Sequence, residues 1–354
     1  MKAKTGAKKI VKKRIGVLTA GGDAPGLNGI LEASCRSLLM AGYEIVGICD
    51  GFEGIFESRT KPISFETLRG LHSQAGTYLG SSNRSTVRKR EKEFVQKYKA
   101  LGLRGLLVAG GDGTFNSLSL VAKDIPLIGV PKTIDNDLSG TEVTFGYDTA
   151  CSVVSDAVDA LRATADAHKR VIIVETMGRT SGWIALGGGL AGYADAILIP
   201  ERPFNKKKFL EFLRHQQNLG ARGILVVVSE GAKAQGEKAK VAFEVKDSPE
   251  AVRLGGIAQV LARWIENEIG WESRHVVLGH LQRARHPTTT DRFLTLAMGV
   301  EVARLVQKDQ WGYAAVYREG RVTKAPISDL MKAARLVDPN HRWVKLAQSL
   351  QIFI

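Results

Sequence analysis

The sequence predicts an α/β protein of two lobes, each a mainly parallel sheet flanked by helices. Short runs rich in β-branched residues alternate with amphipathic stretches, which is typical of βαβ units. Several of these runs end in glycine-rich turns, the position at which open parallel sheets bind ligands. The length of 354 residues exceeds what one small core needs, so two lobes of ordinary size are expected.

The order of these patterns defines the expected elements. We expect strands at residues 15–20, 44–49, 105–109, 126–130, 170–175, 196–199, 223–228 and 275–278. We expect helices at residues 27–40, 91–101, 150–163, 206–219, 251–269 and 288–306. The polar stretch at residues 236–249 is expected to be a surface loop or a short hairpin.

The chain is expected to pass between lobes at a hinge near residues 145–148. Before the first lobe lies a basic tail at residues 1–13. The first lobe is assigned to residues 14–146, completed by residues 283–330. The second lobe is assigned to residues 147–282, completed by residues 331–354.

Composition narrows the class of protein. The formal net charge of +14 favours anionic substrates, with nucleic acid as the rival partner. No apolar run approaches the roughly 18–20 residues that cross a bilayer, and the basic start lacks the pattern of a signal peptide. Cys35, Cys49 and Cys151 have no metal-ligand spacing and are expected to be reduced thiols. A cytoplasmic protein without a membrane partner is therefore expected.

Two glycine-rich turns have the chemistry of phosphate-binding loops. Residues 19–28 follow an expected strand and open a helix, so backbone amides and the positive end of the helix dipole can face a ligand. Residues 110–114 repeat this arrangement and add Asp112, whose carboxylate suits Mg²⁺. The alternatives are a tight turn without a ligand for the first loop and a helix N-cap role for Asp112.

A second aspartate-bearing segment follows the next expected strand. It places Asp135 and Asp137 beside Lys132 and Thr133. Carboxylates near a phosphate are reasonable only where a metal neutralises them or one accepts a proton, and phosphoryl transfer to a hydroxyl needs both. The segment therefore predicts one general base and one carboxylate associated with the metal.

Cationic side chains lie near later strand ends. Arg179 follows one expected strand and is a candidate for stabilising the phosphate in transfer, while Arg170 stands at the beginning of that strand. Arg274 precedes another strand, which leads to residues 279–283 and to Arg285. Such a cluster suits a second phosphate that stays on the substrate, although any one of these arginines alone is better interpreted as a surface residue.

Together these motifs resemble the 6-phosphofructokinase family, in order from about Arg14 to about Asp291. The matching segments are residues 21–28, 111–114, 131–137, 177–179, 229–231 and 279–283. The resemblance implies a two-lobed α/β fold, with the phosphoryl donor on the first lobe and fructose 6-phosphate held largely by the second. It implies Mg²⁺-assisted transfer of the γ-phosphoryl group of ATP to O1 of that sugar, a step of glycolysis.

The resemblance also assigns roles to individual positions. It implies Asp135 as the base, with Arg179 and Thr133 as the other catalytic residues. The residues implied for the donor are Gly22, Gly111, Asp112, Gly113, Thr114 and Arg84, and those implied for the metal are Asp112 and Asp137. The residues implied for the sugar phosphate are Thr133, Ile134, Asp135, Arg170, Met177, Gly178, Arg179, Glu230, Arg274, His280, Leu281, Gln282 and Arg283.

In the family, the arginines at the positions of Arg170 and Arg274 reach in from a neighbouring subunit. The resemblance therefore implies a homodimer or homotetramer with shared sugar-phosphate sites and no nucleic-acid partner. A non-catalytic binder of nucleic acid or a regulatory protein is the distant alternative. It predicts loss of the base or the metal carboxylates, yet Asp112, Asp135 and Asp137 are all present.

The phosphoryl donor is the open question. In this family a Gly at the position of Gly113 leaves room for the α-phosphate of ATP, whereas an Asp there goes with pyrophosphate. Lys132, in contrast, resembles the branch that uses pyrophosphate. A carboxylate at position 113 would repel ATP, but a Lys at position 132 need not exclude it. ATP is therefore the expected donor and pyrophosphate the alternative.

Two positions depart from the family pattern. Asn83 stands where an arginine usually bridges the two substrates, so Arg84 is expected to replace it. Glu32 stands where well-studied bacterial enzymes carry an arginine that binds an effector. A carboxylate there would repel a phosphorylated effector, which argues against that form of regulation.

Overall fold

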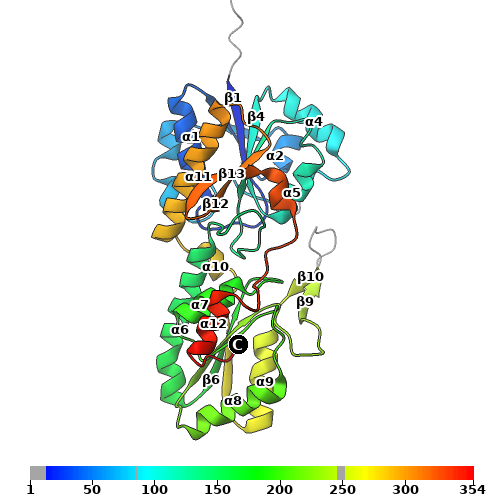
Figure 1. The fold of residues 1–354 in the computed structure, drawn as a ribbon. Coiled ribbons are helices and arrows are strands. Elements are labelled where there is room, and N and C mark those ends of the chain that lie inside the picture. Colours follow the sequence, from blue (N-terminus) through cyan, green and yellow to red (C-terminus); the bar gives the residue numbers. More distant parts are fainter. Residues whose placement is uncertain (1–12, 84–85, 245–251) are drawn as a thin grey trace, which may run out of the picture.

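The computed structural model describes residues 13–83, 86–244 and 252–354. Two lobes lie end to end, and each contains a sheet covered by helices (Figure 1). A two-stranded ribbon, formed by β9 (Val241–Glu244) and β10 (Val252–Leu254), lies beside the second lobe. Among the described residues, no helix is both long and apolar enough to cross a membrane.

The first lobe contains a seven-stranded sheet of order β13-β12-β5-β4-β1-β2-β3. Neighbours from β12 to β2 pair in parallel, and the two edge strands β13 and β3 pair antiparallel. The strands are β1 (Arg14–Thr19), β2 (Glu44–Ile48), β3 (Thr60–Pro62), β4 (Gly105–Gly110), β5 (Leu127–Pro131), β12 (Tyr313–Arg318) and β13 (Arg321–Pro326).

Continuous apolar sequence explains the centre of this sheet, because β4 and β5 are buried along their whole length. Alternate side chains of β4 enter different cores, so helices cover both faces. On the side of Leu107 the helical segments are α1 (Leu27–Met40), α3 (Phe65–Leu68), η1 (Leu71–Ser73) and α11 (Thr289–Gln307). On the side of Leu106 they are α2 (Glu53–Phe56), α4 (Glu91–Ala100), α5 (Asp112–Ser119) and η2 (Ile327–Met331).

The second lobe contains a parallel four-stranded sheet of order β11-β6-β8-β7. Its strands are β6 (Val171–Thr176), β7 (Ala196–Leu198), β8 (Ile224–Ser229) and β11 (Ser273–Val277). One face packs on α6 (Tyr147–His168), α7 (Trp183–Ala191) and α12 (Arg342–Ser349), and the other packs on α8 (Lys206–Asn218) and α9 (Ile257–Ile269). Beyond β7, Phe353 pairs with Ala196, so the C-terminal residues extend the edge of this sheet.

The chain first passes from one lobe to the other through a short turn at residues 145–147, which is held by hydrogen bonds. Phe145 is buried in the first lobe and Tyr147 in the second, with Gly146 between them at φ +92°. The buried carboxylate of Asp291 accepts hydrogen bonds from the backbone amides of Gly146 and Thr149, each at 2.9 Å. Asp291, which lies in α11, thus binds the free backbone amides at the start of α6. Burial raises the pKa of the Asp291 carboxyl to about 6.

All eight expected strands are present within a residue or two of their predicted bounds. The helix expected at residues 251–269 is wrong at its start, because residues 252–254 form β10 and α9 begins at Ile257. A glycine pair at residues 255–256, both with positive φ, separates this strand from the helix. The polar stretch before it is the hairpin of β9 and β10, although residues 245–251 lie outside the described residues, as do residues 1–12 of the expected tail.

Candidate active site between the lobes

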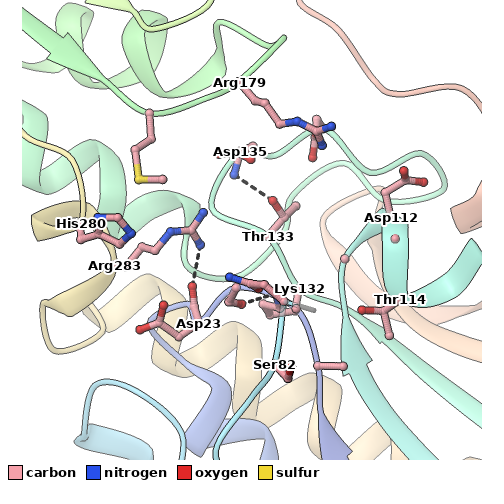
Figure 2. A pocket seen from close by; sticks show the side chains of 18 of the residues that line it. Asp23, Ser82, Asp112, Thr114, Lys132, Thr133, Asp135, Arg179, His280 and Arg283 are labelled. Atoms are coloured by element: carbon pink, nitrogen blue, oxygen red, sulfur yellow. Dashed lines mark hydrogen bonds between the residues drawn. The ribbon is translucent and has the colours of Figure 1, made fainter. Parts of the chain in front are cut away.

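A cleft of about 410 Å³ lies where the carboxyl ends of strands from both sheets meet. Residues from both lobes line it, and Figure 2 shows their side chains converging on one space. The loops that contribute follow β1, β4, β5, β6, β8 and β11. Parallel strands place their carboxyl ends at one edge of a sheet, so the topology itself gathers these loops.

The loop after β1 lies against Arg283 from the second lobe. The Arg283 Nη1 atom donates to the backbone oxygen of Asp23 at 2.7 Å. A Cβ atom at Gly22 would lie 3.0 Å from that nitrogen, so a side chain there would displace the guanidinium. Gly22 therefore permits close approach between the two walls of the cleft.

The loop after β4 leads directly into α5. Gly111 is the N-cap residue and makes no side-chain cap bond, so Asp112 is the first residue of the helix rather than its cap. The Asp112 carboxylate accepts a hydrogen bond from Asn116 at 2.8 Å and lines the cleft. A Cβ atom at Gly113 would meet no atom within 4 Å, so space is open beside this residue. The helix amides and this space can accommodate an anionic group.

The loop after β5 makes a tight turn around Asn136, which has a left-handed φ of +52°. The Asn136 side chain accepts from the backbone amide of Thr144 at 3.0 Å, and Thr133 Oγ1 accepts from the amide of Asp135 at 3.1 Å. Burial, followed by the charge of Asp135, raises the pKa of Asp137 to about 7. This crowded pair of carboxylates would be relieved by a cation or by uptake of a proton.

The site provides limited metal-binding capacity of its own. No group of three or more His, Cys, Asp or Glu side chains in the described part of the chain is arranged to hold a metal ion. Mg²⁺ is typically held by one or two carboxylates while phosphates and water complete its shell. Asp112 and Asp137 provide these two carboxylates, and the charge of Asp112 also raises the pKa of Asp137. The donor set therefore fits Mg²⁺ that is bound together with a phosphate compound.

The wall from the second lobe begins with the loop after β6. Gly178 has φ +139°, and a Cβ atom there would lie 2.5 Å from the backbone oxygen of Ser181, so only glycine fits. The Glu230 carboxylate accepts from the backbone amide of Arg179 at 2.9 Å. Burial raises the pKa of Glu230 to about 7. Met177, Arg179 and Glu230 all line the cleft.

The turn after β11 places His280 and Arg283 in the cleft, with Arg283 in the short helix α10 (Leu281–Ala284). Neighbouring predicted residues do not line it. The side chain of Leu281 is 63% exposed, and Gln282 is buried with its amide donating to the backbone oxygen of Gly279 at 3.0 Å. Ile134 is fully buried in the core of the second lobe. Gln282 and Ile134, like Gly178, therefore contribute to how the loops pack rather than to the lining of the cleft, and Leu281 faces away from the cleft.

Arg170 and Arg274 lie far from this cleft. Arg170 precedes β6 and Arg274 lies at the start of β11, whereas the cleft is at the other end of these strands. A strand of this length spans roughly 15–20 Å, which exceeds the reach of an arginine side chain. Both arginines pair with Glu272, at 2.8 and 2.5 Å respectively. Arg84, predicted to contact the donor, lies outside the described residues.

Other residues that line the cleft were given no individual role from the sequence, although several of them lie in segments predicted to form the site. They are Ala20, Gly21, Asp23, Phe52, Ser82, Asn83, Ser117, Lys132, Leu254 and Gly279. Lys132 is buried, and its ammonium donates to the backbone oxygen of Gly22. From the sequence, Lys132 was predicted only as a neighbour of the carboxylates and as a feature of the branch that uses pyrophosphate. The approach of Leu254 depends on a hairpin whose position cannot be derived from residue spacing.

Comparison with known proteins assigns the chain to a family. The Phosphofructokinase family model matches residues 14–306. The chain is 37% identical over 357 residues to an ATP-dependent 6-phosphofructokinase 2 of Clostridium perfringens, covering 96% of this chain and 98% of the relative. It is 38% identical over 331 residues to a pyrophosphate–fructose 6-phosphate 1-phosphotransferase of Streptomyces coelicolor, covering 92% and 96%.

A solved structure supports the same assignment. The phosphofructokinase of Saccharomyces cerevisiae is 28% identical and aligns with a TM-score of 0.77, covering 90% of this chain. This chain spans 45% of the length of the yeast chain. The family match, the identity to full-length relatives and the shared architecture agree. The chain belongs to the phosphofructokinase family.

Proposed function

We propose that the protein is an ATP-dependent 6-phosphofructokinase that converts fructose 6-phosphate and ATP to fructose 1,6-bisphosphate and ADP. The main support for this proposal is that acidic side chains of one lobe and arginines of the other line the same cleft. Asp112, Asp135 and Asp137 line it from the first lobe, and Arg179 and Arg283 line it from the second. A phosphate held between them would meet a metal site, a base and cations together.

Asp135 is assigned as the general base that accepts the proton of the sugar 1-hydroxyl, with Thr133 holding the loop beside it. Arg179 stabilises charge on the transferring phosphoryl group. Mg²⁺, held by Asp112 and Asp137, would neutralise charge on the donor phosphates when bound. Gly22 and residues 111–114 offer amides and space to those phosphates.

The sugar phosphate is assigned mainly to the second lobe. Met177 and Glu230 contact the sugar, and His280 with Arg283 holds the 6-phosphate. Arg170 and Arg274 lie too far away to act in the cleft of their own chain. We therefore assign them to the site of a neighbouring subunit, which makes the active protein a homodimer or homotetramer in the cytoplasm.

ATP is preferred to pyrophosphate on local grounds. Relatives named for either donor are similarly identical to this chain, at 37% and 38%, so overall similarity does not decide the donor. The open space beside Gly113 supports ATP, because a larger donor needs room there. The Lys132 ammonium already donates a hydrogen bond to the backbone oxygen of Gly22. Its presence therefore does not require that pyrophosphate binds beside it. Pyrophosphate stays the second candidate because Lys132 lines the cleft.

The direct test measures fructose 1,6-bisphosphate formed from fructose 6-phosphate and Mg²⁺, with ATP and pyrophosphate in parallel reactions. Product with ATP alone is the expected result. Product with pyrophosphate alone would replace the donor assignment and make the reaction reversible in metabolism. Absence of product with both donors would overturn the proposed substrate.

A further inference from the structure

Three successive backbone oxygens of the aspartate-bearing loop (residues 133–137) accept hydrogen bonds from outside the loop. The oxygen of Asp135 accepts from Ser181 Oγ at 2.9 Å. The oxygen of Asn136 accepts from Arg335 Nη2, and that of Asp137 accepts from the backbone amide of Arg335, each at 2.7 Å. Arg335, in the C-terminal part of the chain, therefore donates two of these three hydrogen bonds.

Arg335 belongs to the segment that leads from η2 back to the second lobe, referred to as the strap (residues 332–338). Figure 1 shows it descending beside the interface of the lobes to α12. The Trp183 indole donates to the backbone oxygen of Arg335 at 2.7 Å, and the guanidinium carbon lies 4.4 Å from the centre of the Trp183 ring. Arg335 is thus packed between α7 and the aspartate-bearing loop.

A buried carboxylate fixes the strap at a second point. One oxygen of Glu201 accepts from the backbone amides of Val337 and Gly182, each at 2.9 Å. Gly182 is the N-cap residue of α7 and immediately precedes Trp183. The strap is therefore bound to the beginning of one helix by both its backbone and its arginine, so Arg335 has little freedom to move.

The loop needs such support because its central residue has an unfavourable backbone conformation. Asn136 is buried at φ +52°, a left-handed conformation that asparagine tolerates better than other non-glycine residues but that still costs free energy unless surrounding contacts hold it. Thr144 holds its side chain and Arg335 holds its carbonyl. Loss of the guanidinium would leave that carbonyl without its hydrogen bond and allow the peptide to rotate, which would redirect the carboxylates on both sides.

We propose that Arg335 is a positioning residue for catalysis, which orients Asp135 and Asp137 through the backbone of Asn136. This inference rests on the proposed function, because it assumes that these two carboxylates take part in phosphoryl transfer. Arg335 lies beyond residues 14–306, the part of the chain that matches the family model. The C-terminal strap therefore completes the active site without lining it.

The test replaces Arg335 with Met in the full-length chain, which keeps an unbranched stem against Trp183 but removes every side-chain donor. We expect kcat to fall by about 100-fold, the loss typical of a reacting group displaced by 1 Å, while the KM for fructose 6-phosphate changes by less than about threefold. Arg335→Lys restores one donor but not the planar guanidinium, so it is expected to recover about tenfold of that loss and to stay about tenfold below the wild type.

Arg342→Met is the matched control, because this exposed arginine also faces a tryptophan, Trp343, at 6.0 Å, but within the described part of the chain it makes no hydrogen bond to the aspartate-bearing loop. It is expected to keep the kcat of the wild type. A kcat for Arg335→Met equal to that of the wild type would overturn the inference and leave the proposed function intact. An inactive wild type would instead contradict the proposed function.

If Arg335→Met does not fold, Arg335→Lys carries the test, since an ammonium cannot keep the flat contact with Trp183 while reaching Asn136. A reduction of kcat by about tenfold with an unchanged KM would then support the inference. Unchanged kcat would overturn it. A rise of KM with unchanged kcat would also overturn it, because it would place Arg335 in substrate binding.

Discussion

The two walls of the cleft carry opposite charge: carboxylates line the wall of the first lobe, and arginines line the wall of the second. The first lobe presents the carboxylates of Asp112, Asp135 and Asp137 on loops at the ends of β4 and β5. The second lobe presents Arg179 and Arg283 on turns after β6 and β11. The residues proposed as base and metal ligands therefore belong to one lobe, and most of the cations that line the cleft belong to the other. A reacting phosphate therefore requires both lobes.

Among the described residues that line the cleft, each wall also has one charge of the opposite sign, and each of these two side chains hydrogen-bonds to backbone. Lys132 in the first lobe donates to the oxygen of Gly22, whereas Glu230 in the second accepts from the amide of Arg179. These charges hold loops in place as well as facing the cleft. Substitutions in each wall distinguish these roles.

Asp135→Ser removes the assigned base from the first wall. We expect kcat to fall by about 10²–10⁴-fold, the usual contribution of a general base, while the affinity for fructose 6-phosphate changes little. Steady-state kinetics and calorimetric binding of the sugar phosphate measure the two effects. Asp124→Ser, at an exposed aspartate just before β5, is the control. Nearly unchanged turnover would show that the base assignment is wrong.

Gly113→Asp places a carboxylate in the open space of the first wall. We expect kcat/KM with ATP to fall at least about tenfold more than kcat/KM with pyrophosphate, because like charges brought together cost several kcal/mol. Gly113→Ala is the control for bulk without charge. If Gly113→Asp lowered kcat/KM equally with ATP and with pyrophosphate, Gly113 would not determine which donor is used.

Arg283→Met removes a cation from the second wall. The KM for fructose 6-phosphate should rise by about 10–100-fold, the loss expected for a hydrogen bond to a charged group, with a much smaller change in the KM for ATP. Arg285→Met is the matched control, because Arg285 pairs with Asp156 and does not line the cleft. A larger change in the KM for ATP would place Arg283 at the donor instead.

Asp137→Asn tests the electrostatic crowding of the first wall in metal-free protein. The folded pKa of Asp137 is raised to about 7, so the stability linked to its neutral form is present below its ordinary pKa and is lost as pH rises through about 7. The variant should therefore have a Tm higher than the wild type by about 1–3 °C near pH 8, with a smaller difference near pH 5. Glu230 titrates in both proteins, so its contribution cancels. A difference in Tm that does not depend on pH would contradict this account.

The sequence allowed the loops of the first wall to be predicted because their chemistry is local. Gly111, Asp112 and Asp135 each follow an apolar strand within a few residues, and parallel strands bring such positions together. The eight principal strands could be predicted for the same reason. The hairpin of β12 and β13 was missed although Glu319-Gly320, both at positive φ, is a recognisable two-residue turn between alternating runs.

Other parts of the site depend on contacts between distant residues. Arg335 meets the aspartate-bearing loop across about 200 positions of sequence, and no local pattern specifies its contact with Trp183. Helix α9 was predicted to start too early because the apolar Val252 and Leu254 resemble a continuation of its apolar pattern. Leu281 and Gln282 were included with a motif whose neighbours His280 and Arg283 reach the cleft, but a short helix turns these two away from it.

In the proposed reaction, one phosphoryl group passes between the two walls to the sugar. The most direct measurement follows the label from [γ-³²P]ATP in the presence of Mg²⁺ and fructose 6-phosphate, and compares ADP released with labelled fructose 1,6-bisphosphate. We expect equal amounts of ADP and labelled fructose 1,6-bisphosphate and no labelled inorganic phosphate. Release of ADP with the label in inorganic phosphate, or in no sugar product, would contradict it.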